Sequence, residues 1–220
     1  MGFYVKAKGN NIEPVKEGIH QAICVGVFDV GTHYYEAFGN RTHKAVFTWE
    51  LPEQRIIMNK DNELVELPRV ISKTYSATVH EKSVLHKDLK GWRNRAFTEK
   101  ELSQFDLFSM LGKNCMLQII HETNNNKTYA KITSILPLFE GKKPRRPESA
   151  LMFYDFQKHG KNIPAGLPSW IVEFIEASDE YKKLGKAQEQ PETEELAPGE
   201  TASGDIAEED VPDLFEEVLA

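Results

Sequence analysis

The sequence has little of what most enzyme sites are built from. Only two of its 220 residues are cysteines, Cys24 and Cys115, and they form no Cys-x-x-Cys motif. It contains no glycine-rich dinucleotide motif after a strand, no P-loop and no His-Glu-x-x-His. Its seven histidines show no spacing typical of metal ligands. We therefore expect no catalytic residue, no metal and no cofactor. We interpret the cysteines as buried free thiols in a reducing compartment rather than as a disulfide.

Long apolar runs are missing too. No stretch reaches the roughly 18 apolar residues that a membrane-spanning helix needs. The first residues, MGFYVKAKGNN, lack the apolar core of a secretory signal. These absences predict a cytoplasmic protein without a membrane partner.

Basic residues are absent from the end of the chain. Residues 187–220 hold 12 acids and no base, a net charge of −12, whereas residues 1–186 hold 27 bases and 22 acids, a net charge of +5. A mildly basic body with an acidic tail is compatible with a nucleic-acid partner. The tail cannot bury a core and is predicted to be disordered. Apolar residues among its last acids indicate a docking peptide for proteins, formed by Asp210, Asp213, Leu214, Phe215, Glu216 and Glu217.

What the body does contain is alternating apolar sequence. Such patterns predict strands over residues 18–30, 42–51 and 69–79, with a bulge or bend at Gly26 and a loop over residues 33–40. The period then becomes helical over residues 83–93 and 98–111. Thr98 and Glu101 have the spacing of a capping box, and Gly112 marks the helix end.

A hairpin is predicted over residues 114–138, around the turn Asn124–Lys127. Three strands, a helix and two strands is the element order of the OB-fold, a five-stranded Greek-key barrel that this hairpin would close. The fold class is therefore mainly β.

Four regions follow from these patterns. We expect an N-terminal arm (1–17), the barrel (18–138), a basic connector with a C-terminal helix that packs on the barrel (139–185) and the acidic tail (186–220). The helix spans residues 168–184 and Ser169 is its expected cap. The connector reads GKKPRRP, and its lysines and arginines are candidates for phosphate contacts in a flexible segment.

Cations with interleaved aromatic rings suggest a surface for a single strand, because a basic groove follows the phosphates and flat rings stack on bases. Strands two and three with the adjoining loops form the usual surface in an OB-fold. Trp49 shares its strand face with Phe47 and Leu51, which favours a core position over a stacking one, and Tyr75 fits either place. The candidate DNA-binding residues are Tyr35, Phe38, Arg41, Lys44, Trp49, Arg69, Lys73, Tyr75, Arg93, Arg95, Tyr129 and Lys131.

Three segments carry a resemblance to a known family: WRNRAFTEKEL (Trp92–Leu102), the stretch Phe105–Leu138 and the acidic end DVPDLFEEVLA. Together they resemble phage-encoded single-stranded DNA-binding proteins of the OB-fold type. The resemblance implies an OB-fold and sequence-tolerant DNA binding, in the cytoplasm of a bacterial host. Bacterial tails of this kind end in acids followed by Pro-Phe, whereas this chain ends in Glu-Val-Leu-Ala.

The sequence thus predicts a non-enzymatic binder of single-stranded DNA in replication or recombination. Its tail would modulate DNA binding and recruit replication or recombination proteins. The alternative is an OB-fold adaptor that binds proteins of such a complex and has little affinity for DNA.

Overall fold

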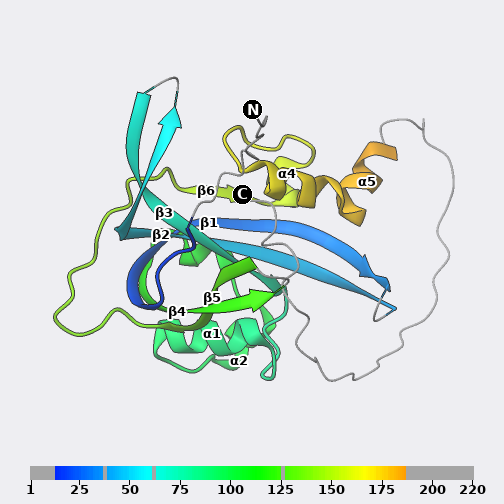
Figure 1. Ribbon diagram of the computed structural model, residues 1–220. Coiled ribbons are helices and arrows are strands. Elements are labelled where there is room, and N and C mark those ends of the chain that lie inside the picture. The colour runs from blue at the N-terminus through cyan, green and yellow to red at the C-terminus, as the bar shows by residue number, and fades with distance from the viewer. Residues whose placement is uncertain (1–12, 37–38, 61–62, 125–126, 187–220) are drawn as a thin grey trace, which may run out of the picture.

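The computed structural model describes residues 13–36, 39–60, 63–124 and 127–186. An antiparallel sheet has the strand order β3-β2-β1-β4-β5 and curls into a half-barrel (Figure 1). A short sixth strand, β6, pairs with β1 in parallel. The strands are β1 (Gly18–Tyr35), β2 (Asn40–Lys60), β3 (Glu63–Ser76), β4 (Asn114–Asn124), β5 (Lys127–Leu136) and β6 (Met152–Tyr154). The prediction of a mainly β chain is confirmed.

Helices cover both sides of the sheet. Figure 1 shows α1 and α2 on one side and α4 and α5 on the other. None of the described helices is long and apolar enough to cross a membrane. The helices are α1 (Val84–Arg93), α2 (Glu99–Ser103), the 3-10 helix η2 (Leu107–Met110), α3 (Phe156–His159), α4 (Ser169–Glu176) and α5 (Asp179–Lys186).

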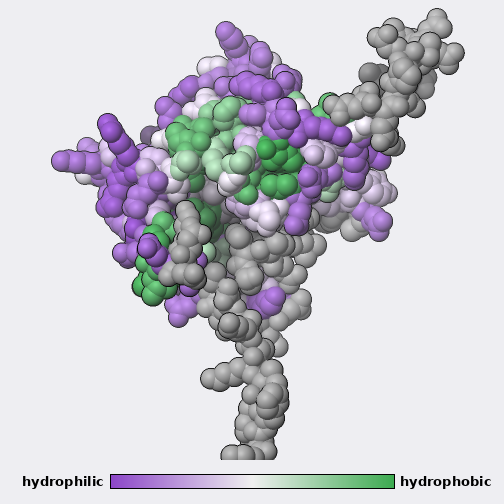
Figure 2. Space-filling view, turned by 90° about the horizontal axis from the view of Figure 1, so that it is seen from above, coloured by the Kyte–Doolittle hydropathy of each residue, from purple (hydrophilic) through white to green (hydrophobic). Residues whose placement is uncertain are grey.

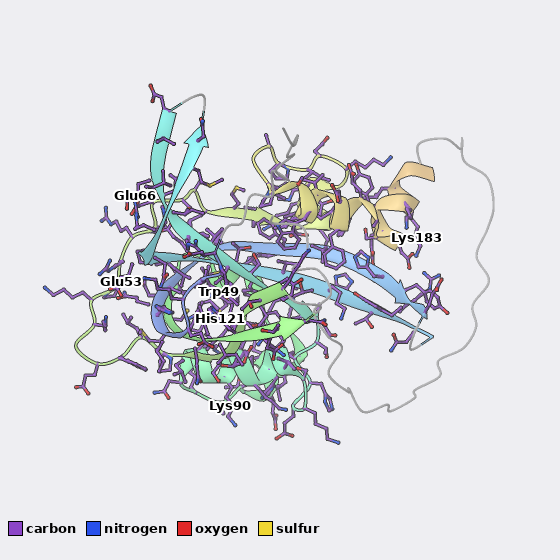
Figure 3. All side chains as sticks on the ribbon, viewed as in Figure 1. Trp49, Glu53, Glu66, Lys90, His121 and Lys183 are labelled. Carbon is purple, nitrogen blue, oxygen red and sulfur yellow. The ribbon has the colours of Figure 1, made fainter. Side chains whose placement is uncertain are left out.

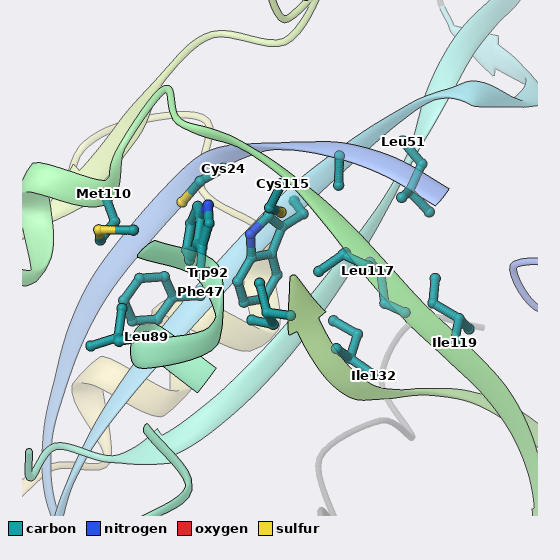
Figure 4. Close-up of a cluster of buried hydrophobic side chains, with 14 of the residues drawn as sticks. Cys24, Phe47, Leu51, Leu89, Trp92, Met110, Cys115, Leu117, Ile119 and Ile132 are labelled. Carbon is teal, nitrogen blue, oxygen red and sulfur yellow. The ribbon is translucent and has the colours of Figure 1, made fainter. Parts of the chain in front are cut away.

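Two hydrophobic cores result from this layering. The larger core fills the concave side of the sheet, where Phe47 and Leu117 meet Leu89 and Trp92 of α1 (Figure 4). It also contains Cys24 and Cys115, which are free and buried as predicted. The smaller core lies on the other side, where β1 and β2 pack against Trp170 and Phe174 of α4. The middle of β1 and β2 is therefore buried on both faces.

A helix, rather than strand pairing, fills the opening of the half-barrel. Among the described strands no ladder joins β5 to β3, so the expectation that the hairpin closes the barrel is wrong. Helix α1 packs on β5, and a Cβ at Gly91 would lie 2.7 Å from the Ile135 carbonyl oxygen. Because only glycine allows this approach, α1 can lie directly on the β5 backbone.

Strands two and three are longer than predicted. After an irregularity between Leu51 and Arg55, β2 and β3 continue to pair from Arg55 and Pro68 to Lys60 and Glu63. This extension forms a ribbon that projects from the sheet (Figure 1). Its residues Ile57 and Leu64 are 68% and 77% exposed. Seen from above, hydrophobic surface occurs in separate patches between hydrophilic side chains (Figure 2).

Other boundaries also differ from the expectations. β1 runs on to Tyr35, so residues 33–35 are strand rather than loop. The predicted bulge at Gly26 is confirmed by the register shift between Cys24 and Gly26. The capping box of Thr98 and Glu101 is confirmed as well. However, the prediction of one helix over residues 98–111 is wrong, because Gln104 is extended and separates α2 from η2.

The predicted C-terminal helix is two helices. α4 ends at Glu176, and the hydroxyl of buried Ser178 accepts a hydrogen bond from the Tyr181 N–H in the first turn of α5. Ser169 is the first helical residue and provides no side-chain cap. The break at residues 177–178 gives α5 a direction of its own, so that its first turn meets the end of β1 and β2.

Candidate nucleic-acid interface

Two of the aromatic candidates lie in the larger core. Trp49 is completely buried, and its ring centroid lies 5.7 Å from that of Phe47 and 5.9 Å from that of Trp92. Figure 3 shows Trp49 in the interior of the molecule. Tyr75 is also buried. Neither ring has a free face. The core position favoured for Trp49 is therefore confirmed, and the candidacy of both residues for stacking on bases is wrong. Both point inward because they share the sheet face of other apolar residues.

Lys73 and Tyr75 serve to hold α1 in place. The Asp88 carboxylate of α1 accepts hydrogen bonds from Lys73 Nζ and the Tyr75 hydroxyl, both at 2.8 Å. Lys73 Nζ also lies 3.2 Å from the Ile132 carbonyl oxygen of β5. Burial, together with the Asp88 charge, raises the pKa of Tyr75 well above its ordinary value. This network joins β3, α1 and β5 and presents no cation to a ligand.

Arg93 and Arg95 both bind Glu101 of the capping box. The Arg93 guanidinium lies over the rings of Phe97 and Phe105, 4.4 and 4.8 Å from their centroids. Hydrogen bonds from Arg93, the Thr98 backbone and Arg95 lower the pKa of Glu101 to about 2. These arginines therefore stabilise the loop that joins α1 to α2.

The candidate DNA-binding residues on β3 and on the β4–β5 hairpin also contact neighbouring protein groups. Arg69 donates a hydrogen bond to the Glu13 carbonyl. Lys131 Nζ lies 2.9 Å from Glu122 Oε1 on the neighbouring strand, and Tyr129 is paired opposite Glu122. Phe38 and the docking residues of the tail lie outside the described residues.

A ring and a cation do meet at the far end of β1 and β2. Tyr34 lies directly opposite Arg41, and the guanidinium carbon is 5.7 Å from the ring centroid. Beside them, Lys44 Nζ lies 4.9 Å from the Tyr35 ring centroid and donates a hydrogen bond to Ser76 Oγ. Lys44 is buried, so the expectation that it contacts DNA is wrong. Tyr34 is 54% exposed and therefore has the free surface that stacking needs. The sequence reasoning chose Tyr35 and missed Tyr34. If the alternating strand pattern of residues 18–30 had been continued through residue 35, it would have identified Tyr34.

The first turn of α5 lies against this end of the strands. Asp179 forms an ion pair with Arg41. The Glu180 carboxylate accepts hydrogen bonds from the Thr32 N–H at 2.7 Å and the Thr32 hydroxyl at 2.6 Å. Burial raises the pKa of Glu180, but the bonds from Thr32 outweigh it, so the pKa is lowered overall. The acidic first turn of α5 thus occupies a cation of the candidate interface.

His43 connects the same elements. Its Nε2 is 2.7 Å from Asp29 Oδ1, and its Nδ1 is 3.6 Å from Glu180 Oε1. The hydrogen bond to Asp29 raises the pKa of the imidazole above its ordinary value, although partial burial opposes this. The protonated form of His43 is therefore favoured by the folded chain.

We expect His43 to stabilise the fold more strongly in mild acid than in mild base. A folded-state pKa above the ordinary value of about 6.5 gives stabilisation that is present below that pH and is lost as the pH rises through the folded pKa. Thermal unfolding of the natural chain and of His43→Gln should differ most at about pH 5.5 and least at about pH 8.5. A difference that grows with pH would contradict the assignment.

Within the described residues, no group of three histidine, cysteine or acidic side chains is placed to hold a metal ion. The comparisons with known proteins add no family to this description. No protein-family model matches the chain, and no curated protein is similar enough to count as a match.

Proposed function

We propose that this chain binds single-stranded DNA without sequence preference, in DNA replication or recombination. The observation that carries the proposal is the exposed Tyr34 ring beside the Arg41 guanidinium, at the end of a strand pair. A ring with a nearby cation suits a nucleotide, because the ring stacks on the base and the cation binds the phosphate. The net charge of +5 over residues 1–186 attracts the polyanion to this surface.

An OB-fold is part of this proposal. The strand order β3-β2-β1-β4-β5, with α1 between the third and fourth strands, agrees with a partly open barrel of that type. OB-folds bind oligonucleotides on strands two and three and the adjoining loops. Here the middle of β2 is covered by the C-terminal helices, which restricts the ligand to the ends of the strands.

The acidic tail fits a modulating role. Asp179 already binds Arg41 where a DNA phosphate would bind, so acidic groups can compete with DNA for this site. The tail continues the chain directly after α5 and adds 12 acids. Once displaced by DNA, it would be available to recruit replication or recombination proteins.

The test is fluorescence anisotropy of labelled oligo-dT over a range of salt concentrations. We expect salt-dependent binding, tighter binding after deletion of residues 187–220, and a loss of about 1–3 kcal/mol of binding free energy for Tyr34→Ala. Leu102→Ala, which removes an exposed apolar side chain of α2, is the control and should bind normally.

The absence of salt-dependent binding, even in the deletion variant, would refute the proposal and favour the protein adaptor. The exposed Ile57 and Leu64 of the β2–β3 ribbon favour that second function, since apolar groups on a projecting ribbon suit a protein partner. If deletion of residues 187–220 leaves the affinity for DNA unchanged, only the modulating role of the tail is refuted.

A further inference from the structure

The segment between β5 and β6 is basic and has a fixed course. We call residues 139–149 the strap. They contain neither helix nor strand, and their cations Lys142, Lys143, Arg145 and Arg146 are exposed. The sequence suggested a flexible connector, but three side chains of the sheet bind the strap backbone.

Gln21 and Asn114 hold the middle of the strap. Gln21 Nε2 donates to the Lys143 carbonyl oxygen at 2.9 Å. The Asn114 side chain donates to the Arg145 carbonyl oxygen at 3.0 Å and accepts from the Arg145 N–H at 2.9 Å. Pro144 lies between the two bound residues and limits the backbone further. The backbone thus faces the protein on both sides of the proline.

Glu50 holds the far end of the strap. Its side chain is completely buried, and its carboxylate accepts the N–H groups of Glu148 at 3.0 Å and Ser149 at 2.7 Å. A buried carboxylate is costly unless it is hydrogen-bonded. The strap supplies both of these donors, so its backbone stabilises the buried carboxylate, together with the nearby charge of Arg55.

Two strap cations are left for a ligand. Glu53 binds Arg145 Nη2 at 2.9 Å and is 3.9 Å from Lys142 Nζ, while Glu148 binds Arg55. Figure 3 shows Glu53 on the side of the molecule along which the strap runs. Within the described part of the chain, Lys143 and Arg146 form no ion pair. The three-residue step from Lys143 to Arg146 spans up to about 10 Å, which allows the two side chains to contact different phosphates.

We propose that the strap is a phosphate-binding site for single-stranded DNA, with Lys143 and Arg146 as the contacts and Glu50 as a positioning residue. This inference rests on the proposed function for the identity of the polyanion. It adds a site that lies on a different element from Tyr34 and Arg41. Preorganisation matters here, because side chains on a fixed backbone lose less entropy when they bind.

The test compares two double variants with the same loss of charge. Lys143→Ala with Arg146→Ala removes the proposed contacts, and Lys87→Ala with Lys90→Ala removes two exposed cations of α1. Figure 3 labels Lys90. Each phosphate contact to a single strand contributes about 0.7 to the slope of log affinity against log salt. The strap variant should therefore lose about 1.4 from the slope and about 25-fold in affinity for oligo-dT at about 0.1 M salt. The α1 variant should change neither by a comparable amount.

The role of Glu50 is tested by Glu50→Gln. We expect faster amide hydrogen exchange at Glu148 and Ser149 and weaker oligo-dT binding, with the Tyr34→Ala effect preserved. Asn114→Ala loosens the strap without a change in charge and serves if Glu50→Gln does not fold. Equal affinity and equal salt slope in the two double variants would overturn the strap site while the proposed function stands. Failure of the natural chain and of the tail deletion to bind oligo-dT would overturn both.

Discussion

Replacement of Trp49 by alanine is expected to lower the free energy of unfolding by about 3–5 kcal/mol and to leave the DNA affinity of the folded chain unchanged. Trp49 is completely buried between Phe47 and Trp92 in the centre of the larger core. Its removal leaves a cavity that β2, β3 and α1 can fill only by moving, and close-packed cores relax only in part. A tryptophan on a binding surface would behave in the opposite way, since its loss would weaken DNA binding and hardly affect stability.

Urea unfolding followed by circular dichroism measures the first effect, and oligo-dT anisotropy measures the second. Trp49→Phe retains most of the ring volume and is the variant to use if the alanine chain does not fold. A Trp49→Phe chain of nearly natural stability that binds DNA about five-fold more weakly or worse would contradict the core assignment. That loss is the lower limit of what stacking of one base contributes.

Local patterns allowed parts of the fold to be predicted. The capping box at Thr98 and Glu101, the bulge at Gly26 and the strand pair around residues 124–127 each depend on neighbouring residues, and the structure has all three. Element lengths were harder, because they depend on tertiary contacts. The predicted strand over residues 42–51 stops just before Pro52, yet β2 passes this proline with an irregularity and pairs again from Arg55. The sequence gives no sign that β3 remains beside it as a partner.

The candidate site was less predictable than the fold. A sequence shows where its cations are but not which carboxylates fold against them. Arg41 is bound by Asp179, which is 138 residues away in the chain, and no local pattern indicates that contact. The strap shows the reverse case. Its basic run is obvious in the sequence, but its fixed course depends on Gln21, Glu50 and Asn114, which belong to strands distant in the sequence.

A second large effect is expected at Asp88. Replacement of Asp88 by alanine should destabilise the fold by about 3 kcal/mol, because it leaves the Lys73 ammonium largely buried without its anion. The two side chains are only 16% and 11% exposed, so water compensates little for the lost ion pair. The Tyr75 hydroxyl loses its acceptor as well. The DNA affinity of the folded variant should stay the same, since Lys73 faces α1 and β5 rather than a ligand.

The double variant Asp88→Leu with Lys73→Met separates the charge from the packing. If the cost arises from an unpaired buried ammonium, removal of both charges should recover most of the lost stability, as replacement of buried ion pairs by apolar groups often does. Urea unfolding of Asp88→Leu, of Lys73→Met and of the double variant gives the coupling energy between the two side chains directly. Additive losses would show that Lys73 and Asp88 act independently. A loss of DNA affinity in folded Lys73→Met would show that Lys73 belongs to the DNA-binding surface. Helix α1 would then border that surface instead of only filling the opening of the half-barrel.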